Sequence, residues 1–400
     1  MRVGRIAVVS PFIDKRHGTE RHVAEWTSHL GSDYEVHVYS QRVEDLDFSH
    51  VRWHRIPKLP GPHLFNFLWW FAANHLWRWW DRRVRGISHD LVFTPGTNCL
   101  DADVISVHIV FAEFARRVRQ ELAWRRNPVR SWPRLLHRHL YYRLITFLER
   151  RLYTNQNTSL ILIARKTADE LMRIYGRNGS LPVVYTGVDQ NAFNPERRNE
   201  LRADARQRLD LDSSTCALLL VGNDWRNKGL PTLLKAIETF KELPMVLLVA
   251  GSDDPYPFQK QIEERGLQGR VRFLPSRPDI EWYYAAADVY VGPSLVDTFA
   301  LPPAEAMACG VPVITTVTNG TAEIITDGAD GLIVQDPNNV EELAAKIRLL
   351  FDDAGLQHRL GENAALTARQ YTWDRNGEEI RTIFADALLR KAQRSQNRRS

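Results

Sequence analysis

Short runs rich in β-branched residues alternate with helical patterns along the whole chain, and this alternation constrains the fold more than any other feature. Alternating strands and helices predict a parallel sheet covered on both faces. In the first half the expected strands are Arg5–Val9, Glu35–Tyr39, Val51–Ile56, Leu91–Thr94, Val104–His108 and Leu160–Ala164. In the second half they are Leu218–Val221, Val246–Ala250, Val271–Leu274, Val289–Val291, Val313–Thr315 and Leu332–Val334. The sequence therefore predicts two doubly wound α/β domains in succession.

The length and the charge distribution support two domains with different partners. A chain of 400 residues that is 44% hydrophobic is long enough for two domains with separate cores. Residues 1–200 carry 30 basic and 20 acidic residues, whereas the remainder carries 23 and 28. Residues 52–151 alone hold 18 basic against 7 acidic residues. An anionic partner is therefore expected to bind the first half.

The cysteines and the chain start indicate a reducing compartment. Cys99, Cys216 and Cys309 lie far apart and have no histidine partners at metal-binding spacing, so neither a disulfide framework nor a zinc site is expected. The first residues enter a strand directly, without the pattern of a signal peptide. No apolar run approaches the roughly 18 residues of a membrane span. We expect a cytoplasmic protein.

Residues 293–312, PSLVDTFALPPAEAMACGVP, place two carboxylates, Asp297 and Glu305, around a strand-to-helix turn. If all of this spacing were helical, the two backbone positions would be roughly 12 Å apart. The carboxyl pair of a glycosidase is separated by about 5 to 9.5 Å. We therefore expect these acids to hold two ends of an extended ligand. Its anionic middle would meet amides at a helix N-terminus, those of Thr298, Phe299, Ala300 and Leu301.

Two other turns follow a strand and lead into a helix, an arrangement that points backbone amides at a phosphate. Residues 223–229, NDWRNKG, supply the cations Arg226 and Lys228. Taken alone, a solvated turn with two surface cations explains them equally well. The loop SPFIDKRHGTERHV supplies Gly18, which permits close backbone approach, and Thr19 as an expected N-cap. A plain strand-to-helix loop also explains this second pattern.

The segment 293–312 resembles the E-x(7)-E signature of retaining GT-B glycosyltransferases of family 4, the group 1 enzymes. Asp297 stands where the family usually has the first Glu, and Ala300 replaces a usual Gly, which matters less if its φ is negative. In the family the first acid contacts the transferred hexose and the second contacts the nucleotide ribose. The resemblance assigns these roles to Asp297 and Glu305.

Two further segments carry the same resemblance. Gly222, Lys228 and Gly229 match the family form G-R-x-x-x-x-K-G, with Asn223 at the Arg position and Arg226 displaced. Lys228 is thereby expected to contact the donor diphosphate. Residues 103–108 resemble the strand D-V-I-H-A-H, which implies that His108 borders the acceptor and the transferred sugar. A hydrogen-bonded histidine at a strand end is the alternative interpretation.

Resemblances near the domain limits complete the predicted architecture. Residues 183–195 resemble the family linker, and residues 371–373 open a helix that in the family returns to the first domain. We predict an acceptor-binding domain over 1–188, a sugar-nucleotide-binding domain over 189–370, and a helix with a basic tail over 371–400 that frays after Leu389. The fold class implied is GT-B, two doubly wound Rossmann-like domains with a central cleft. A partial match to G-G-x-x-E implies donor contacts by Thr316, Asn319, Gly320, Thr321 and Glu323, although Thr321 could equally cap the next helix.

Residues 65–85, FNFLWWFAANHLWRWWDRRVR, combine five tryptophans and three phenylalanines with arginines. Helical spacing predicts an apolar stripe rimmed by arginines, formed by Phe67, Trp70, Phe71, Trp77 and Trp80 with Arg78, Arg82 and Arg85. Residues 114–153 are basic and aromatic as well. A membrane surface or a cradle for a lipid-linked acceptor is one interpretation, and helices packed on their own sheet are the other. Nucleic acid is not expected, because no recognition module accompanies the charge.

The resemblance implies a retaining hexosyltransferase that moves a sugar from a UDP- or GDP-linked donor to a glycan or lipid-linked acceptor. Cell-envelope polysaccharide or glycolipid synthesis is the expected setting, either in the cytoplasm or peripherally on the inner face of the plasma membrane. Transfer is expected to need no metal or other cofactor, with His108, Asp297 and Lys228 as catalytic residues. Two alternatives stay open: a sugar-nucleotide epimerase, which needs no acceptor, and a membrane-associated binding or scaffold protein with a decayed site.

Overall fold

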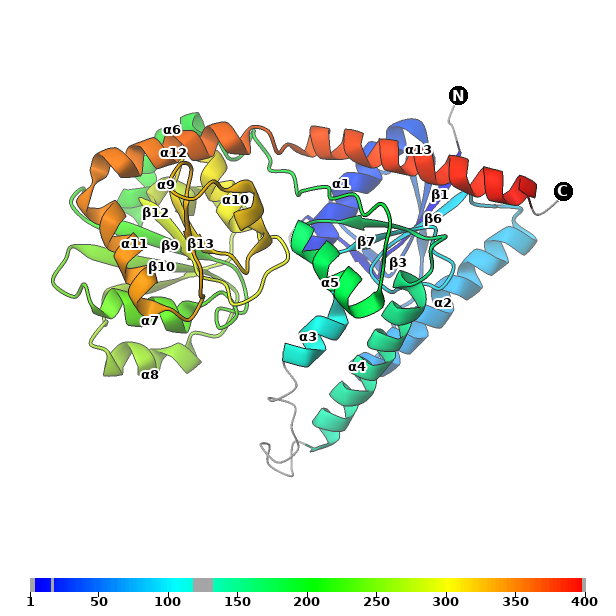
Figure 1. Cartoon of the computed structure of the whole chain (residues 1–400), viewed down its shortest axis with the longest axis horizontal. Coiled ribbons are helices and arrows are strands. Elements are labelled where there is room, and N and C mark those ends of the chain that lie inside the picture. The colour runs from blue at the N-terminus through cyan, green and yellow to red at the C-terminus, as the bar shows by residue number, and fades with distance from the viewer. Residues whose placement is uncertain (1–3, 16–17, 118–131, 398–400) are drawn as a thin grey trace. The chain divides into compact units, whose positions relative to one another are not determined.

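The computed structural model describes residues 4–15, 18–117 and 132–397, and the chain forms two compact α/β units (Figure 1). The first unit comprises Met1–Tyr185 and Asn376–Ser400, and the second comprises Thr186–Arg375. Each contains a six-stranded parallel sheet with helices on its faces. The predicted α/β class with two doubly wound sheets is confirmed. The unit limits lie within a few residues of the predicted limits at 188 and 370.

The sheet of the first unit has the strand order β5-β3-β1-β6-β7-β8. Its strands are β1 (Arg5–Val9), β3 (Glu35–Ser40), β5 (Val51–Arg55), β6 (Leu91–Pro95), β7 (Val104–Val107) and β8 (Ser159–Leu162). The register places Ile6 of β1 opposite Val36 on one side and Leu91 on the other. A short parallel pair that was not predicted, β2 (Phe12–Ile13) and β4 (Arg42–Val43), lies outside this sheet.

The sheet of the second unit repeats this topology with the order β11-β10-β9-β12-β13-β14. Its strands are β9 (Cys216–Val221), β10 (Met245–Gly251), β11 (Val271–Pro275), β12 (Val289–Gly292), β13 (Val313–Thr316) and β14 (Leu332–Val334). The first and fourth strands of each sheet are neighbours, and the direction of winding reverses between them. Ligands of open α/β sheets bind beyond the carboxyl ends of the strands at this switch point. In the second unit the loops after β9 and β12 flank that point.

Helices cover both faces of the first sheet. One face packs on α1 (Gly18–Asp33) and on the C-terminal helix α13 (Trp373–Asn397). The other face packs on α2 (His63–Val84), α4 (Trp132–Tyr153) and α5 (Arg165–Tyr175), and the short α3 (Phe111–Arg117) contacts α4 and α5. None of the helices in the described part of the chain is both long enough and apolar enough to span a bilayer.

The helix α13 extends further than the sequence predicted. The indole of Trp26 in α1 donates a hydrogen bond of 2.7 Å to Asn376, which ties the start of this region to α1. The segment after Leu389 was expected to fray, but it is helical as far as Asn397. Lys391 forms an ion pair of 2.7 Å with Asp103, and Arg394 donates to the carbonyl of Asn157 at 2.8 Å. These polar contacts hold a segment that lacks an apolar pattern of its own.

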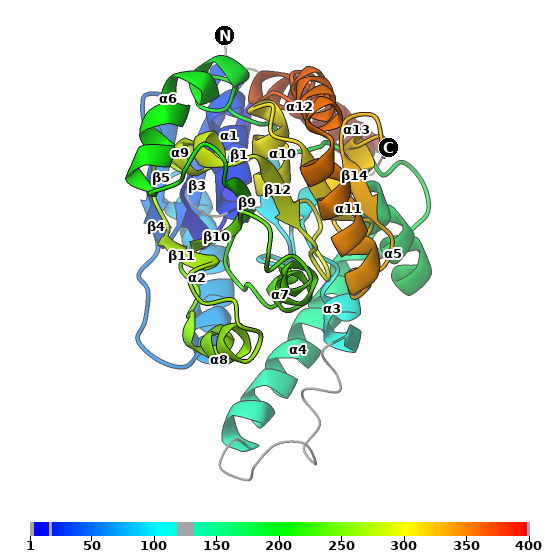
Figure 2. The ribbon, with the colours of Figure 1, turned by 90° about the vertical axis from the view of Figure 1, so that its left-hand side faces the viewer.

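In the second unit one sheet face packs on α7 (Leu230–Glu238), α8 (Tyr256–Glu264) and α11 (Val340–Asp352). The remaining helices are α6 (Pro195–Arg208), α9 (Glu281–Ala286), α10 (Leu301–Ala308), the 3-10 helix η3 (Gly320–Ile324) and α12 (Ala354–Ala368). Figure 2, which looks onto this unit, shows α10 beside β12. Because β12 leads through one loop into α10, the helix N-terminus lies at the carboxyl edge of the sheet.

One glycine allows the loops after β9 and β12 to approach each other. Gly229 has φ of +83°, a left-handed conformation that favours glycine. A Cβ atom at this position would lie 2.0 Å from the carbonyl oxygen of Pro293, far inside van der Waals contact. Only the absence of a side chain therefore lets the end of the first loop touch the start of the second.

We expect Gly229→Ala to destabilise the protein more than Gly269→Ala. Both glycines have positive φ, so both variants carry a penalty of about 1–2 kcal/mol. Gly269 has open space around its Cβ position, so it lacks the additional clash with Pro293 and serves as the control. Urea unfolding monitored by circular dichroism measures the difference. Equal unfolding midpoints for the two variants would contradict the close approach.

Candidate active site at the β9 and β12 loops

The loops that follow β9 and β12 are hydrogen-bonded to each other. The amide of Leu295 donates to the carbonyl of Asn227 at 2.7 Å, and the Asn227 side chain donates to the carbonyl of Val296 at 2.8 Å. This pairing places the ammonium of Lys228 2.5 Å from a carboxylate oxygen of Asp297, with both side chains partly exposed. Two residues 69 positions apart, predicted to serve one donor, are thus in direct contact.

A buried tryptophan fixes the loop that carries Lys228. Trp225 is 1% exposed, and its ring stacks on Phe273 with centroids 5.0 Å apart. Its amide donates to a carboxylate oxygen of Asp253 at 2.8 Å. Trp225 was not among the predicted site residues, although one large aromatic residue in an otherwise polar turn was an available signal. Because Trp225 is buried, the loop is anchored to the core and Lys228 is held in a defined position.

The two other predicted donor residues of this loop lie at its exposed edge. The side-chain oxygen of Asn223 accepts a hydrogen bond of 2.8 Å from the amide of Ser252, so it joins the loops after β9 and β10. That oxygen is therefore already engaged. Arg226 is exposed, and its side chain has no ion pair or hydrogen bond with the described residues. Arg226 is a cation that a ligand phosphate could reach.

The second acid, Glu305, is held by a tyrosine that sequence analysis missed. Glu305 is 6% exposed, and the hydroxyl of Tyr284 donates to it at 2.8 Å. Burial, and next the charge of Glu305, raise the pKa of Tyr284 well above its usual value. The hydroxyl therefore stays protonated and donates to the carboxylate. Tyr284 lies in α9, 21 positions earlier in the chain, so no local spacing indicated the contact.

The helix N-terminus between the two acids offers fewer amides than predicted. The helix α10 starts at Leu301, and its N-cap Ala300 has φ of −80°, so alanine causes no strain there. The Ala300 amide, predicted as a phosphate donor, already donates to Asn319 at 3.2 Å. Pro302 and Pro303 have no N–H to offer. Within the described chain, the amides of Thr298 and Leu301 have no hydrogen-bond partner, and Phe299 is buried between them.

The segment after β13 supports this turn. Asn319 is 1% exposed, and its side-chain oxygen accepts from the amides of Ala300 and Thr321. Asn319 is therefore the N-cap of η3, and the expectation that Thr321 caps this helix is wrong. The hydroxyl of Thr321 instead donates to the carbonyl of Ala300 at 2.6 Å. The Gly320 amide donates to the carbonyl of Asp297 at 3.0 Å, so the segment shapes the loop from behind.

In the first unit, the predicted residues Gly18 and His108 lie near a histidine that sequence analysis did not single out. His22 and His108 have ring centroids 5.0 Å apart, and a nitrogen of His22 lies 3.0 Å from the carbonyl oxygen of Gly18. The Ser106 hydroxyl lies 3.1 Å from His108. Gly18 is the first residue of α1, so Thr19 lies inside the first turn and is not the N-cap. The neighbouring His17 lies outside the described residues.

Burial keeps both histidines neutral. Burial lowers the pKa of His22 to about 4. Burial, and next the repulsion that a protonated His22 would exert, lower the pKa of His108 well below its usual value. A neutral imidazole offers one hydrogen-bond donor and one acceptor. This pair can therefore position a hydroxyl group near neutral pH, rather than supply a fixed positive charge.

Two protein-family models match the chain, one on each half. Residues 16–192 match the model Glycosyltransferase Family 4, and residues 202–367 match the model Glycosyl transferases group 1. The two matches leave only nine residues between them unassigned. The chain belongs to the family 4, or group 1, glycosyltransferases.

Relatives and solved structures agree with this family. A D-inositol 3-phosphate glycosyltransferase of Xylanimonas cellulosilytica is 29% identical, over 59% of this chain and 58% of the relative. The chain thus spans a little over half the length of that curated relative. WaaG, a glycosyltransferase involved in lipopolysaccharide biosynthesis, superimposes with a TM-score of 0.77 at 21% identity, covering 94% of this chain and 99% of WaaG. Anabaena HepE, solved in complex with UDP-glucose, gives 0.70 at 18% identity, covering 96% and 100%. These likenesses show that the fold of this chain is GT-B.

We expect acid to destabilise this family member partly through His22. The unfolded chain, with a histidine pKa of about 6.5, binds more protons than the folded chain between pH 6.5 and 4. The free energy of unfolding therefore falls as pH drops through this window, by about 2 kcal/mol at pH 5 from His22 alone. Urea unfolding at pH 7.5 and pH 5 measures the loss.

The variant His22→Gln should lose less stability between these two pH values than the wild type. His358→Gln, which removes an exposed histidine, should keep the wild-type difference. An unchanged pH dependence in His22→Gln would show that His22 is not held neutral.

Proposed function

We propose that the chain is a retaining hexosyltransferase that uses a nucleotide diphosphate sugar as donor. One observation carries the proposal: the Lys228 ammonium lies 2.5 Å from Asp297, in the turn that leads into the helix bearing Glu305. Along one short path, Asp297 suits the sugar, Lys228 and the helix N-terminus suit the diphosphate, and Glu305 suits the ribose. The second unit is therefore the proposed donor-binding unit.

In this proposal each end of the donor meets one acid. Glu305, oriented by Tyr284, accepts hydrogen bonds from the ribose hydroxyls, because a buried carboxylate next to a protonated tyrosine keeps acceptor capacity. Asp297 accepts from the hexose hydroxyls. The shorter side chain, compared with the usual family glutamate, places this carboxylate closer to its own backbone, where it lies 2.5 Å from Lys228. We therefore expect the replacement of this glutamate by Asp297 to affect the binding of the hexose rather than of the other parts of the donor.

The diphosphate lies between these ends and meets positive groups. Two unit charges 4 Å apart interact by about 4 kcal/mol at an effective dielectric constant of about 20. Lys228 and the amides of Thr298 and Leu301 are preorganised, so they stabilise charge that develops on the leaving diphosphate without rearrangement. Arg226 can add a second cation from the exposed edge. We propose that these groups stabilise the charge of the leaving diphosphate, so that transfer needs no metal.

The transfer step we propose proceeds on one face of the sugar. The bond from the anomeric carbon to the diphosphate oxygen breaks, the acceptor hydroxyl oxygen forms the new bond on the same face, and its proton passes to the leaving phosphate oxygen. The anomeric configuration is then retained. His108, neutral and next to His22, can orient a sugar or acceptor hydroxyl through its ring nitrogens.

The acceptor we propose is a glycan or lipid-linked molecule that carries negative charge. The excess of arginine over residues 52–151 supports an anionic acceptor. Two relatives support the same class, since one is named a D-inositol 3-phosphate glycosyltransferase and WaaG is involved in lipopolysaccharide biosynthesis. A role in cell-envelope glycan or glycolipid synthesis follows from this acceptor class.

Donor binding should raise the melting temperature of the purified chain. Screening UDP-, GDP- and ADP-sugars by thermal shift identifies the base, and UDP-glucose is the first candidate because HepE was solved with it. A ligand present at 100 times its Kd stabilises by about 2.7 kcal/mol. No shift with any of these donors would contradict the proposal. With a binding donor, NMR of the product tests retention and shows whether turnover needs an acceptor.

We expect Lys228→Ala and Glu305→Ala each to lower kcat/KM by at least about 100-fold, because each removes a charged contact to the donor. Steady-state transfer assays measure this. The matched control is Lys235→Ala, which removes an exposed lysine from the next helix and should retain wild-type rates. Circular dichroism checks that the variants are folded. Wild-type rates in either site variant would reject its assigned role.

A further inference from the structure

The helix α2 exposes large apolar side chains along its outer side. Its core-facing side is already buried, with Trp70, Ala73, Asn74, Arg78 and Asp81 packed inward. On the opposite side six large apolar residues are between 48% and 58% exposed: Phe65, Leu68, Leu76, Trp79, Trp80 and Val84. We call these six residues the outer face of α2. Most of them follow helical spacing of three or four residues, so they form a second stripe.

This arrangement corrects the stripe predicted from sequence and combines the two interpretations left open. Trp70 and Arg78, assigned to an exposed stripe with an arginine rim, are 2% and 7% exposed. Arg78 forms a bidentate ion pair with Asp101 at 2.6 and 2.8 Å. The helix therefore packs on its own sheet and also presents an apolar face outward. Of the second predicted block, residues 118–131 lie outside the described chain.

The exposed charges that α2 itself carries are all positive, and the nearby Asp101 is paired with Arg78. Arg82, Arg83 and Arg85 are exposed, whereas Asp81, the acidic residue of α2, is 1% exposed. The neighbouring α4 has the same character: its Glu149 is 1% exposed, and its exposed cations are Arg134, Arg138, Arg143, Arg150 and Arg151. Leu136, Leu140 and Phe147 of α4 are also about half exposed. No carboxylate on either helix is exposed, so none stands on their surfaces to repel a bound anion.

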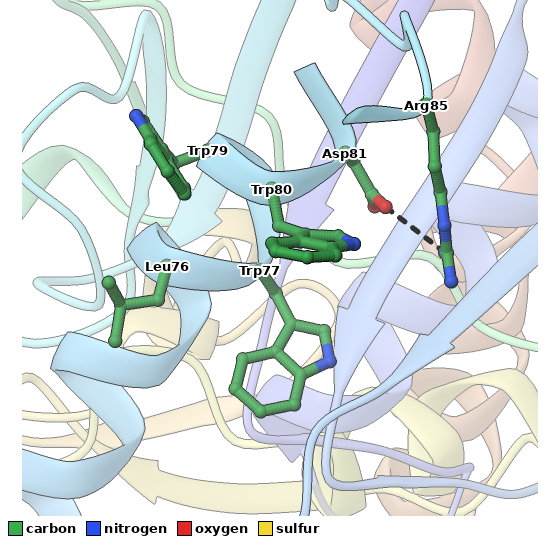
Figure 3. A pocket seen from close by; sticks show the side chains of 6 residues that line it. All are labelled: Leu76, Trp77, Trp79, Trp80, Asp81 and Arg85. Carbon is green, nitrogen blue, oxygen red and sulfur yellow. Dashed lines mark hydrogen bonds and ion pairs between the residues drawn. The ribbon is translucent and has the colours of Figure 1, made fainter. Parts of the chain in front are cut away.

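A pocket opens at the C-terminal end of the outer face (Figure 3). It has a volume of about 390 Å³ and is lined by Leu76, Trp77, Trp79, Trp80, Asp81 and Arg85. The indole rings and Leu76 form an apolar wall, and the Arg85 guanidinium, 3.1 Å from Asp81, stands at the polar side. An apolar chain with an anionic head fits this distribution of groups.

We propose that the outer face of α2 binds an anionic membrane surface. The six apolar side chains enter the boundary between headgroups and acyl chains, the indoles lie at headgroup level, and the pocket receives part of one acyl chain. Arg82, Arg83 and Arg85 bind lipid phosphates. A second copy of the chain is a poor occupant, because two faces flanked by arginines alone would repel each other.

Half-exposed apolar residues on both α2 and α4, with cations spread along both helices, favour a lipid surface over a single protein groove. The positive charge of these arginines is complementary to the negative charge of the cytoplasmic leaflet, which attracts basic segments by about 1 kcal/mol per Lys or Arg. An acidic protein partner is the competing occupant, and the experiment below distinguishes it.

The test is co-sedimentation of the full chain with vesicles of phosphatidylcholine containing 40% phosphatidylglycerol, and with vesicles of phosphatidylcholine alone. The wild type should sediment with the anionic vesicles and stay in the supernatant with the neutral ones. Leu76→Ser/Trp79→Ser should bind the anionic vesicles at least tenfold more weakly, because two inserted side chains are lost. The matched control is Leu349→Ser/Leu366→Ser, which removes two exposed leucines of the second unit that are 46% and 59% exposed, and it should bind like the wild type.

The electrostatic part is tested with Arg82→Gln/Arg83→Gln, which should bind about thirtyfold more weakly at low salt. Its control, Arg359→Gln/Arg390→Gln, removes two exposed arginines elsewhere and should bind like the wild type. Failure of the wild type to sediment with anionic vesicles would overturn the proposal. Binding of both α2 variants to the anionic vesicles as tightly as the wild type would also overturn it. Retention of the wild type on immobilised polyglutamate without vesicle binding would overturn it as well and would identify an acidic protein partner.

The α2 variants should keep the wild-type thermal shift with nucleotide sugars in the absence of vesicles, since their side chains lie in the first unit and the proposed donor residues in the second. Donor binding without vesicle binding would reject the membrane proposal alone. Vesicle binding without any donor binding would reject the transferase proposal alone.

Discussion

The contact between Lys228 and Asp297 is the interaction on which the candidate site depends. It exists because Gly229 lets one loop touch the carbonyl of Pro293, and because Asn227 and Leu295 then join the loops by hydrogen bonds. A cation beside a carboxylate is neutral as a pair, so the loops can approach without charge repulsion. A diphosphate that reaches Lys228 must share it with Asp297. In the proposed function, Lys228 would thereby be linked to both the leaving group and the sugar.

The surrounding residues act by fixing positions rather than by direct chemistry. Trp225 anchors the first loop in the core, Asn319 ties the turn before α10 to the segment after β13, and Tyr284 orients Glu305. These three side chains are almost completely buried. Asn319 and Tyr284 bond to groups from other elements, whereas the Trp225 ring is held by its packing on Phe273. A preorganised site of this kind stabilises developing charge with little rearrangement. The first unit provides a different environment, in which burial keeps His22 and His108 neutral.

The two units also differ in their outer surfaces. The first unit has most of the arginines, and on α2 and α4 they stand beside apolar residues that the sheet does not cover. Burial of Asp81 and Glu149 removes the negative charges that would oppose an anionic partner. Asp81 accepts a hydrogen bond from Tyr39 and lies 2.8 Å from His54, and its other oxygen pairs with Arg85, so this carboxylate is already engaged by its own unit.

The sequence by itself determined the fold class, the twelve strands of the two sheets and the acids and lysine of the candidate site. Hydrophobic periodicity and local motifs depend on neighbours in the chain, and these signals were sufficient. Only the tertiary structure decided which groups are available. In the structure the Ala300 amide donates to Asn319, and Tyr284 donates to Glu305. Trp70 and Arg78 are buried, and the tail is helical to Asn397. Each of these outcomes depends on contact with an element distant in sequence, whose position follows from the packing of the whole unit and leaves no local pattern.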